Sequence, residues 1–100
     1  MIFNDYQSKV RKYADYPHEL GPFYIIMDMM KNVGTISDNL KKSILKDGNL
    51  NESMIMIIKR NLGYLLNNIS NIAADLDLNL EDIAQDNIYY LEVMNKNKEN

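Results

Sequence analysis

The apolar residues of this chain recur every three or four positions, and this helical period is the feature that most constrains its fold. Three segments show the period: Ile26, Met29, Met30, Val33, Ile36, Leu40 and Ile44 in the first, Ile55, Ile58, Leu62, Leu65, Ile69, Ile72 and Leu76 in the second, and Ile83, Ala84, Asn87, Ile88, Leu91 and Met94 in the third. Leu62 and Leu65 lie centrally on the second stripe and are expected in the core. No segment alternates apolar and polar residues as a strand does. The pattern predicts an all-α fold, an antiparallel four-helix bundle that oligomerisation completes.

Helix-capping residues divide the chain into four expected helices. Asn4 or Asp5 can cap a short opening helix. The apolar residues of that helix are Phe3, Tyr6, Val10 and Tyr13. Pro22 suits the first turn of the second helix, because that turn needs no N–H donor at its start. Asn51 and Asn79 can cap the third and fourth helices.

The length and composition fit a single domain. One hundred residues, of which 46% are hydrophobic and 25% charged, are typical of a globular protein rather than of a disordered chain. We expect one helical domain over residues 1–94 and a charged disordered tail over residues 95–100. No apolar run approaches the ~20 residues of a membrane span, and no basic segment precedes an apolar one at the N-terminus. The expected location is therefore the cytoplasm, with no membrane contact.

Charge and residue usage exclude several classes of function. The chain has no cysteine, which excludes disulfides, thiolate chemistry and Cys-ligated zinc, and the single His18 cannot build a histidine metal site alone. Any metal would need carboxylates. No cofactor is expected, except Mg²⁺ if acidic side chains supply a site for it. The net charge of -3 disfavours nucleic-acid binding. The 14 Asn and 12 Ile, together with the small size, suit a protein of a phage or another mobile element.

Two very apolar strings exceed what one neighbouring helix can cover. They are FYIIMDMM, residues 23–30, and MIMIIK, residues 54–59. Their methionines are suited to filling a core or an interface: Met27, Met29, Met30, Met54 and Met56. A second subunit is the natural cover for the excess apolar surface, so we expect a homodimer or a tetramer.

Three strings resemble the MazG-like all-α nucleoside triphosphate pyrophosphohydrolases, and together they span almost the whole chain. FNDYQSKV is similar to the family's opening F-x-x-Y-Q, which a Tyr-Pro loop follows. IIMDMMKNVGTISDNLKK lines up with the family's G-L-x-x-E-x-G-E-x-x-E-x-x-K-K, with Gly34, Lys41 and Lys42 in step. The segment that begins KRNLGYLL resembles the family's next helices, and there the polar Asn87 is in step as well as the apolar period.

The resemblance implies a metal site that this chain has lost. In the family, four carboxylates written E-x-x-E and E-x-x-D hold Mg²⁺ against the triphosphate, and hard oxygen ligands suit that ion. Position by position they correspond to Asn32, Thr35, Asn61 and Tyr64, none of which is a carboxylate. On a helical wheel these vacated metal-ligand positions lie off the apolar stripe, on the side that faces the next layer. The ring of Tyr64 either plugs the former site or points to solvent.

Part of a nucleotide site remains under the same resemblance. Asn87 corresponds to a nucleotide-contacting amide, and Lys41 and Lys42 to the family's paired lysines, whereas a neighbouring lysine of the family is lost. Asn87 is equally suited to a hydrogen bond between helices. Asn32 and Asn61 are alternatively solvated residues of an Asn-rich chain.

These observations leave three hypotheses about function. The first is a catalytically inactive, homodimeric MazG-fold protein that binds a nucleotide-like ligand or a protein partner without hydrolysis. The second is a divergent Mg²⁺-dependent nucleoside triphosphate pyrophosphohydrolase that uses Asp28, Asp38 and neighbouring acids. The third is a purely structural helical interaction module whose wide Met-rich surface binds its partner.

Overall fold

The computed structural model describes residues 2–17 and 19–99, and these residues form four helices and no strand. The helices are α1 (Phe3–Lys12), α2 (Pro22–Asp47), α3 (Glu52–Asp75) and α4 (Leu80–Glu99). The all-α prediction is confirmed. Most of the expected charged tail is part of α4 here, since that helix continues to Glu99.

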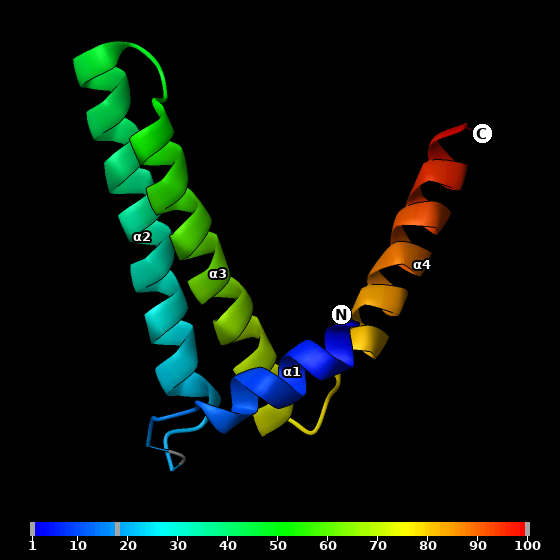
Figure 1. Ribbon diagram of the computed structural model, residues 1–100. Helices are drawn as coiled ribbons and strands as arrows, with labels where there is room; N and C mark the ends of the chain where they lie inside the picture. Colours follow the sequence, from blue (N-terminus) through cyan, green and yellow to red (C-terminus); the bar gives the residue numbers. More distant parts are fainter. Residues whose placement is uncertain (1, 18, 100) are drawn as a thin grey trace.

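The two long helices α2 and α3 lie side by side and run in opposite directions (Figure 1). Gly48 ends α2 in the left-handed conformation, at a φ of 72°, and its N–H donates to the carbonyl of Ile44 at 2.9 Å. Ser43 Oγ donates to the carbonyl of Asn49 at 2.8 Å, which ties the turn back onto the helix. The short turn therefore reverses the chain and sets α3 directly against α2.

The opening helix α1 crosses the C-terminal end of α3 and holds the start of α4 (Figure 1). Gln7 bonds the connection twice, because its Nε2 donates to the carbonyl of Leu78 at 2.9 Å and its Oε1 accepts from the N–H of Leu80 at 3.0 Å. Asn4 Oδ1 accepts from the N–H of Glu81 at 3.2 Å. These bonds satisfy amide groups at the N-terminus of α4 that have no partner within the helix.

A single chain does not close into the expected four-helix bundle. Figure 1 shows α4 pointing away from the α2–α3 pair, and its packing is chiefly against α1. Asp77 has a φ of 58° in the connection between α3 and α4, and the bonds from α1 fix the direction in which α4 leaves. The antiparallel pair is present, whereas the fourth helix packs chiefly elsewhere and does not cover its faces.

Two of the expected helix caps are confirmed and one is wrong. Asn51 Oδ1 accepts from the N–H of Met54 at 2.9 Å, and Asn79 Oδ1 accepts from the N–H of Asp82 at 2.9 Å. The N-cap of α1 is Ile2, so Asn4 and Asp5 lie inside the helix. Asn4 fails as a cap of its own helix because its carboxamide serves α4 instead.

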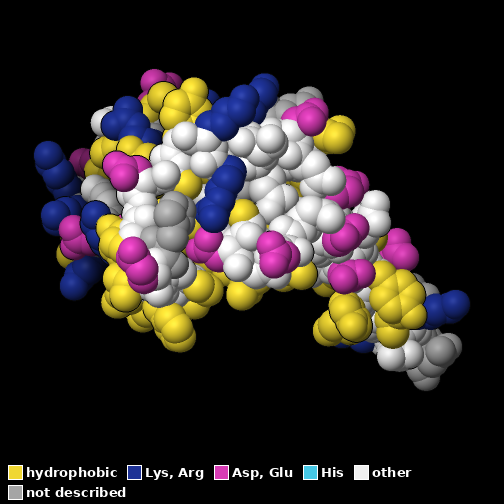
Figure 2. Space-filling model, turned by 90° about the horizontal axis from the view of Figure 1, so that it is seen from below, with side chains coloured by type: hydrophobic (Ala, Val, Ile, Leu, Met, Phe, Trp, Pro, Cys, Tyr) yellow, Lys and Arg dark blue, Asp and Glu magenta, His cyan; other side chains and the backbone are white. Residues whose placement is uncertain are grey.

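The most deeply buried side chains of α2 and α3 are mainly polar, whereas the residues of the apolar stripes are exposed or only half-buried. The buried residues of the pair include Asn32, Asn61 and Asn68, whereas Val33 is 53% exposed and Leu62 is 52% exposed. The expectation that Leu62 lies in the core is therefore wrong for the single chain, and Leu65 is only half-buried. Figure 2 shows hydrophobic side chains gathered along one edge of the molecule and again on the part that projects from it, which is α4 in Figure 1. The buried hydrophobic residues among those described are Ile25, Ala73 and Leu80.

Gly34 lies in the middle of α2 with open space around it, since a Cβ placed there meets no atom within 4 Å. Gly34→Ala should therefore raise the free energy of unfolding by about 0.5–1 kcal/mol, because glycine loses more chain entropy than alanine in a helix. Urea denaturation followed by circular dichroism measures the change. Gly48→Ala is the matched control and should destabilise, because its φ of +72° strains any side chain. A loss of stability in Gly34→Ala would show that another chain packs against this position.

Candidate functional site

Three polar side chains join α2 to α3 at the N-terminal half of α2. Asn68 Nδ2 donates to Asp28 Oδ2 at 2.9 Å, and Asn32 Nδ2 donates to Asn68 Oδ1 at 2.9 Å. Asn32 Nδ2 also lies 3.4 Å from Asp28 Oδ2. Asn32 and Asn68 are buried at 7% and 4% exposure, so the interpretation of Asn32 as a solvated surface residue is wrong. We call Asp28, Asn32 and Asn68 the amide cluster.

Thr35 and Asn61, two other vacated ligand positions, bond to the backbone of their own helices. Asn61 is 6% exposed, and its Nδ2 donates to the carbonyl of Ile57 at 2.9 Å. Thr35 Oγ1 donates to the carbonyl of Lys31 at 3.1 Å. The alternative that Asn61 is solvated is therefore wrong as well, and both side chains satisfy local backbone acceptors rather than a shared ligand.

The amide cluster forms one side of a pocket of about 320 Å³ between α2 and α3. Lys31, Tyr64 and Asn67 complete its lining. Tyr64 is 48% exposed, so its ring stands at the wall of the pocket and is partly open to solvent. The pocket offers amide donors and acceptors, an ammonium group and an aromatic ring. These groups can bind a small polar molecule that has a flat portion.

The residues that the resemblance assigns to ligand binding are not brought together in one chain. Lys41 and Lys42 are exposed in the C-terminal half of α2, and Lys42 Nζ lies 3.0 Å from Asp38 Oδ2 in an exposed ion pair. Asn87 is exposed on α4, which points away from α2 and α3 (Figure 1). Neither the lysines nor Asn87 lines the pocket at the amide cluster.

Asp28 and Asp38 lie on one helix ten residues apart. At a rise of about 1.5 Å per residue their backbone positions are about 15 Å apart along the axis, too far for both carboxylates to bind one ion. No group of three or more His, Asp or Glu side chains within the described residues could hold a metal ion. The metal site that the divergent-enzyme hypothesis requires would therefore need ligands beyond those that this arrangement places together.

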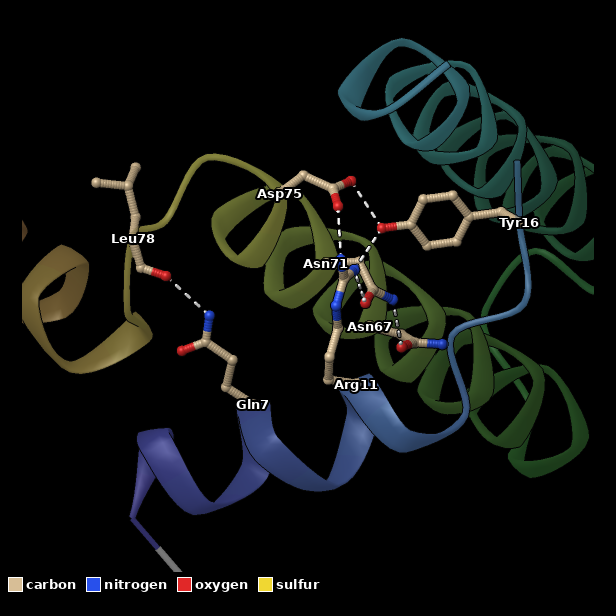
Figure 3. A network of polar contacts seen from close by, with 7 residues as sticks. All are labelled: Gln7, Arg11, Tyr16, Asn67, Asn71, Asp75 and Leu78. Atoms are coloured by element: carbon tan, nitrogen blue, oxygen red, sulfur yellow. Dashed lines mark hydrogen bonds and ion pairs between the residues drawn. The ribbon is translucent and has the colours of Figure 1, made fainter. Parts of the chain in front are cut away.

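A second polar network, which the sequence did not indicate, ties α1 to the end of α3 (Figure 3). Arg11 Nη2 donates to Asp75 Oδ1 at 2.8 Å, and Arg11 Nη1 donates to Asn71 Oδ1 at 3.2 Å and to the hydroxyl of Tyr16. The Tyr16 hydroxyl in turn donates to Asp75 Oδ2 at 2.7 Å. Burial raises the pKa of the Tyr16 phenol, and its bond to Asp75 adds to the rise. One local signal was available, because a carboxylate in the last turn of a helix opposes the helix dipole and needs a partner.

Tyr16 links this network to the wall of the candidate site. Its ring stacks on Tyr24 with 5.9 Å between centroids and 8° between ring planes. Tyr24 belongs to the first turn of α2, one turn before Asp28. The network therefore positions the aromatic side chains beside the amide cluster.

In comparisons with known proteins, no family model, no curated protein and no solved structure matches this chain. Within the described residues, no helix combines the length and apolar character needed to cross a membrane.

Asp75→Asn should lower the free energy of unfolding by about 1–3 kcal/mol, because Asp75 is 9% exposed at its side chain and accepts from two donors. The 35% exposure of Arg11 keeps the expected loss in the lower part of that range. Denaturant unfolding measures it. Asp38→Asn removes the same charge from an exposed ion pair and should change stability by less than about 0.5 kcal/mol. Equal effects of the two changes would contradict a structural role for the network.

Proposed function

We propose that this protein is a catalytically inactive member of the MazG-like fold class that binds a nucleotide-like ligand without hydrolysing it. The observation that carries the proposal is the amide cluster at a pocket between α2 and α3. Asn32 and Tyr64, two of the four positions where the resemblance expects metal-binding acids, line this pocket. The pocket offers buried amides and the single carboxylate of Asp28, and one carboxylate is too little negative charge to hold Mg²⁺ tightly. Binding without metal-dependent chemistry follows from that change.

The pocket lining suggests how such a ligand would be held. The ammonium group of Lys31 would face a phosphate, and the half-exposed ring of Tyr64 would pack against a base. Asn67 would donate to a base or sugar through its Nδ2 group. Asn32 and Asn68 are occupied with each other and would position Asp28 rather than contact the ligand.

We further propose that the protein works as a homodimer or tetramer, because of the wide exposed apolar faces of the helices. Ile26, Val33 and Leu62 are each exposed by 46% or more in the single chain. Contiguous apolar surface of this kind is typical of a protein interface. The same observation favours a second candidate function, a helical interaction module that uses this surface to bind a protein partner.

Nucleoside triphosphates should raise the melting temperature of the protein without Mg²⁺, because a ligand that binds only the folded state stabilises it by mass action. No pyrophosphate should be released when Mg²⁺ is added. Lys31→Gln should remove most of the stabilisation by nucleotide, whereas Lys46→Gln, an equal charge change at the far end of α2, should leave it intact. Differential scanning fluorimetry and a pyrophosphate release assay measure the two quantities.

Two outcomes decide against the proposal. Mg²⁺-dependent pyrophosphate release that Asp28→Ala abolishes would establish the divergent enzyme instead. Absence of any stabilisation by nucleotides, with the apolar surface still binding a partner chain, would favour the interaction module.

A further inference from the structure

A second pocket of about 220 Å³ lies beside the amide cluster, where the segment after α1 meets α2 and α3. Three tyrosines contribute to its lining: Tyr13, Tyr16 and Tyr24. Two carboxylates, Asp15 and Asp28, also line it, and no Lys or Arg within the described residues does. The pocket therefore combines aromatic rings with two carboxylates in its lining.

Asp28 presents one carboxylate oxygen for a ligand. Its Oδ2 accepts from Asn68 Nδ2 at 2.9 Å and lies 3.4 Å from Asn32 Nδ2. Its Oδ1 accepts no hydrogen bond from the described part of the chain. Because the two amides hold the carboxylate from one side, its second oxygen is an oriented acceptor for an N–H donor.

Close to this pocket, the same residue types already hold a guanidinium group of the chain itself, that of Arg11. The Arg11 guanidinium donates to Asn71 Oδ1, Asp75 Oδ1 and the hydroxyl of Tyr16, and its central carbon lies 5.8 Å from the centroid of the Tyr16 ring (Figure 3). The second pocket presents a comparable set, since it brings together the carboxylate of Asp28, asparagine amides and the ring of Tyr24. Its lining within the described residues supplies no cation to match.

We propose that this pocket binds a guanidinium group, stacked on Tyr24 and donating an N–H to Asp28 Oδ1. A planar delocalised cation suits an aromatic ring and a carboxylate better than a compact ammonium does, because it stacks and donates at the same time. Tyr16 stacks on one face of the Tyr24 ring, and the 39% exposure of Tyr24 leaves its other face for the guanidinium. The group belongs either to a small guanidino compound or to an arginine side chain of a protein partner.

This inference is independent of nucleotide binding, although the two pockets share Asp28, Asn67 and Asn68. Nucleotide binding, as proposed above, depends on Lys31 and should be largely lost in Lys31→Gln. The guanidinium proposal depends on the charge of Asp28 and should survive that change. A chain that binds no nucleotide would still bind the cation.

The test is an NMR titration of the full chain with ethylguanidinium, with ethylurea as its neutral planar analogue. The side-chain amide signals of Asn67, Asn68 and Asn71 are the reporters. Ethylguanidinium should give saturable shifts of these signals, and ethylurea should bind about tenfold more weakly or not at all. A Gly-Arg-Gly tripeptide that binds more tightly than ethylguanidinium indicates a protein arginine, and equal affinity indicates a small compound.

Variants make the test specific to the pocket. Asp28→Asn should weaken ethylguanidinium binding about tenfold, and Asp38→Asn, the same charge change on the same helix, should leave it unchanged. Tyr24→Leu should weaken binding without altering Asp28, and it covers the case in which Asp28→Asn disturbs the amide cluster. Equal binding of ethylguanidinium and ethylurea by the unmodified protein, or no saturable shift with either, overturns the proposal.

Discussion

Packing of α3 against α2 through buried amide side chains is the constraint on which the rest of the structure depends. Buried amides are stable only when each finds a partner, and here Asn32, Asn68 and Asp28 satisfy one another across the two helices. Asn61 satisfies its donor on its own helix. Because polar side chains occupy the most buried positions of the pair, the residues of the apolar stripes are exposed or only half-buried.

The exposed stripes explain why the single chain is open rather than closed. α1 fixes the start of α4 through Gln7 and Asn4 and holds the end of α3 through Arg11. The rest of α4 leaves the α2–α3 pair, with Ile88 and Leu91 exposed. So few buried hydrophobic residues give a weak core, since burial of apolar surface is the main favourable term in folding. The proposed second copy would supply the missing burial.

The sequence predicted the helices well because their signals are local. The apolar period, Pro22 at the start of α2 and the caps Asn51 and Asn79 each act within a few residues. The orientation of the helices could not be predicted in this way. The helical period locates an apolar stripe but not the surface that covers it. Val33 and Leu62 both lie on the predicted stripes and are nevertheless exposed in the single chain. Asn32 and Asn61 were identified as candidates only through the family resemblance. Their burial between α2 and α3 could not be predicted from the apolar period. The Arg11–Asp75 ion pair joins residues 64 positions apart, a distance over which the pattern carries no pairing information.

Static light scattering across micromolar concentrations tests most directly whether the exposed stripes are an interface. If they are, the unmodified chain has a mass of twice or four times 11.7 kDa. Leu62→Lys, which places a charge on the exposed face of α3, should shift the mass toward the monomer, whereas Ser53→Lys on the same helix should not. A mass of 11.7 kDa at every concentration, from a chain that still unfolds cooperatively, would show that the stripes are not an interface between copies.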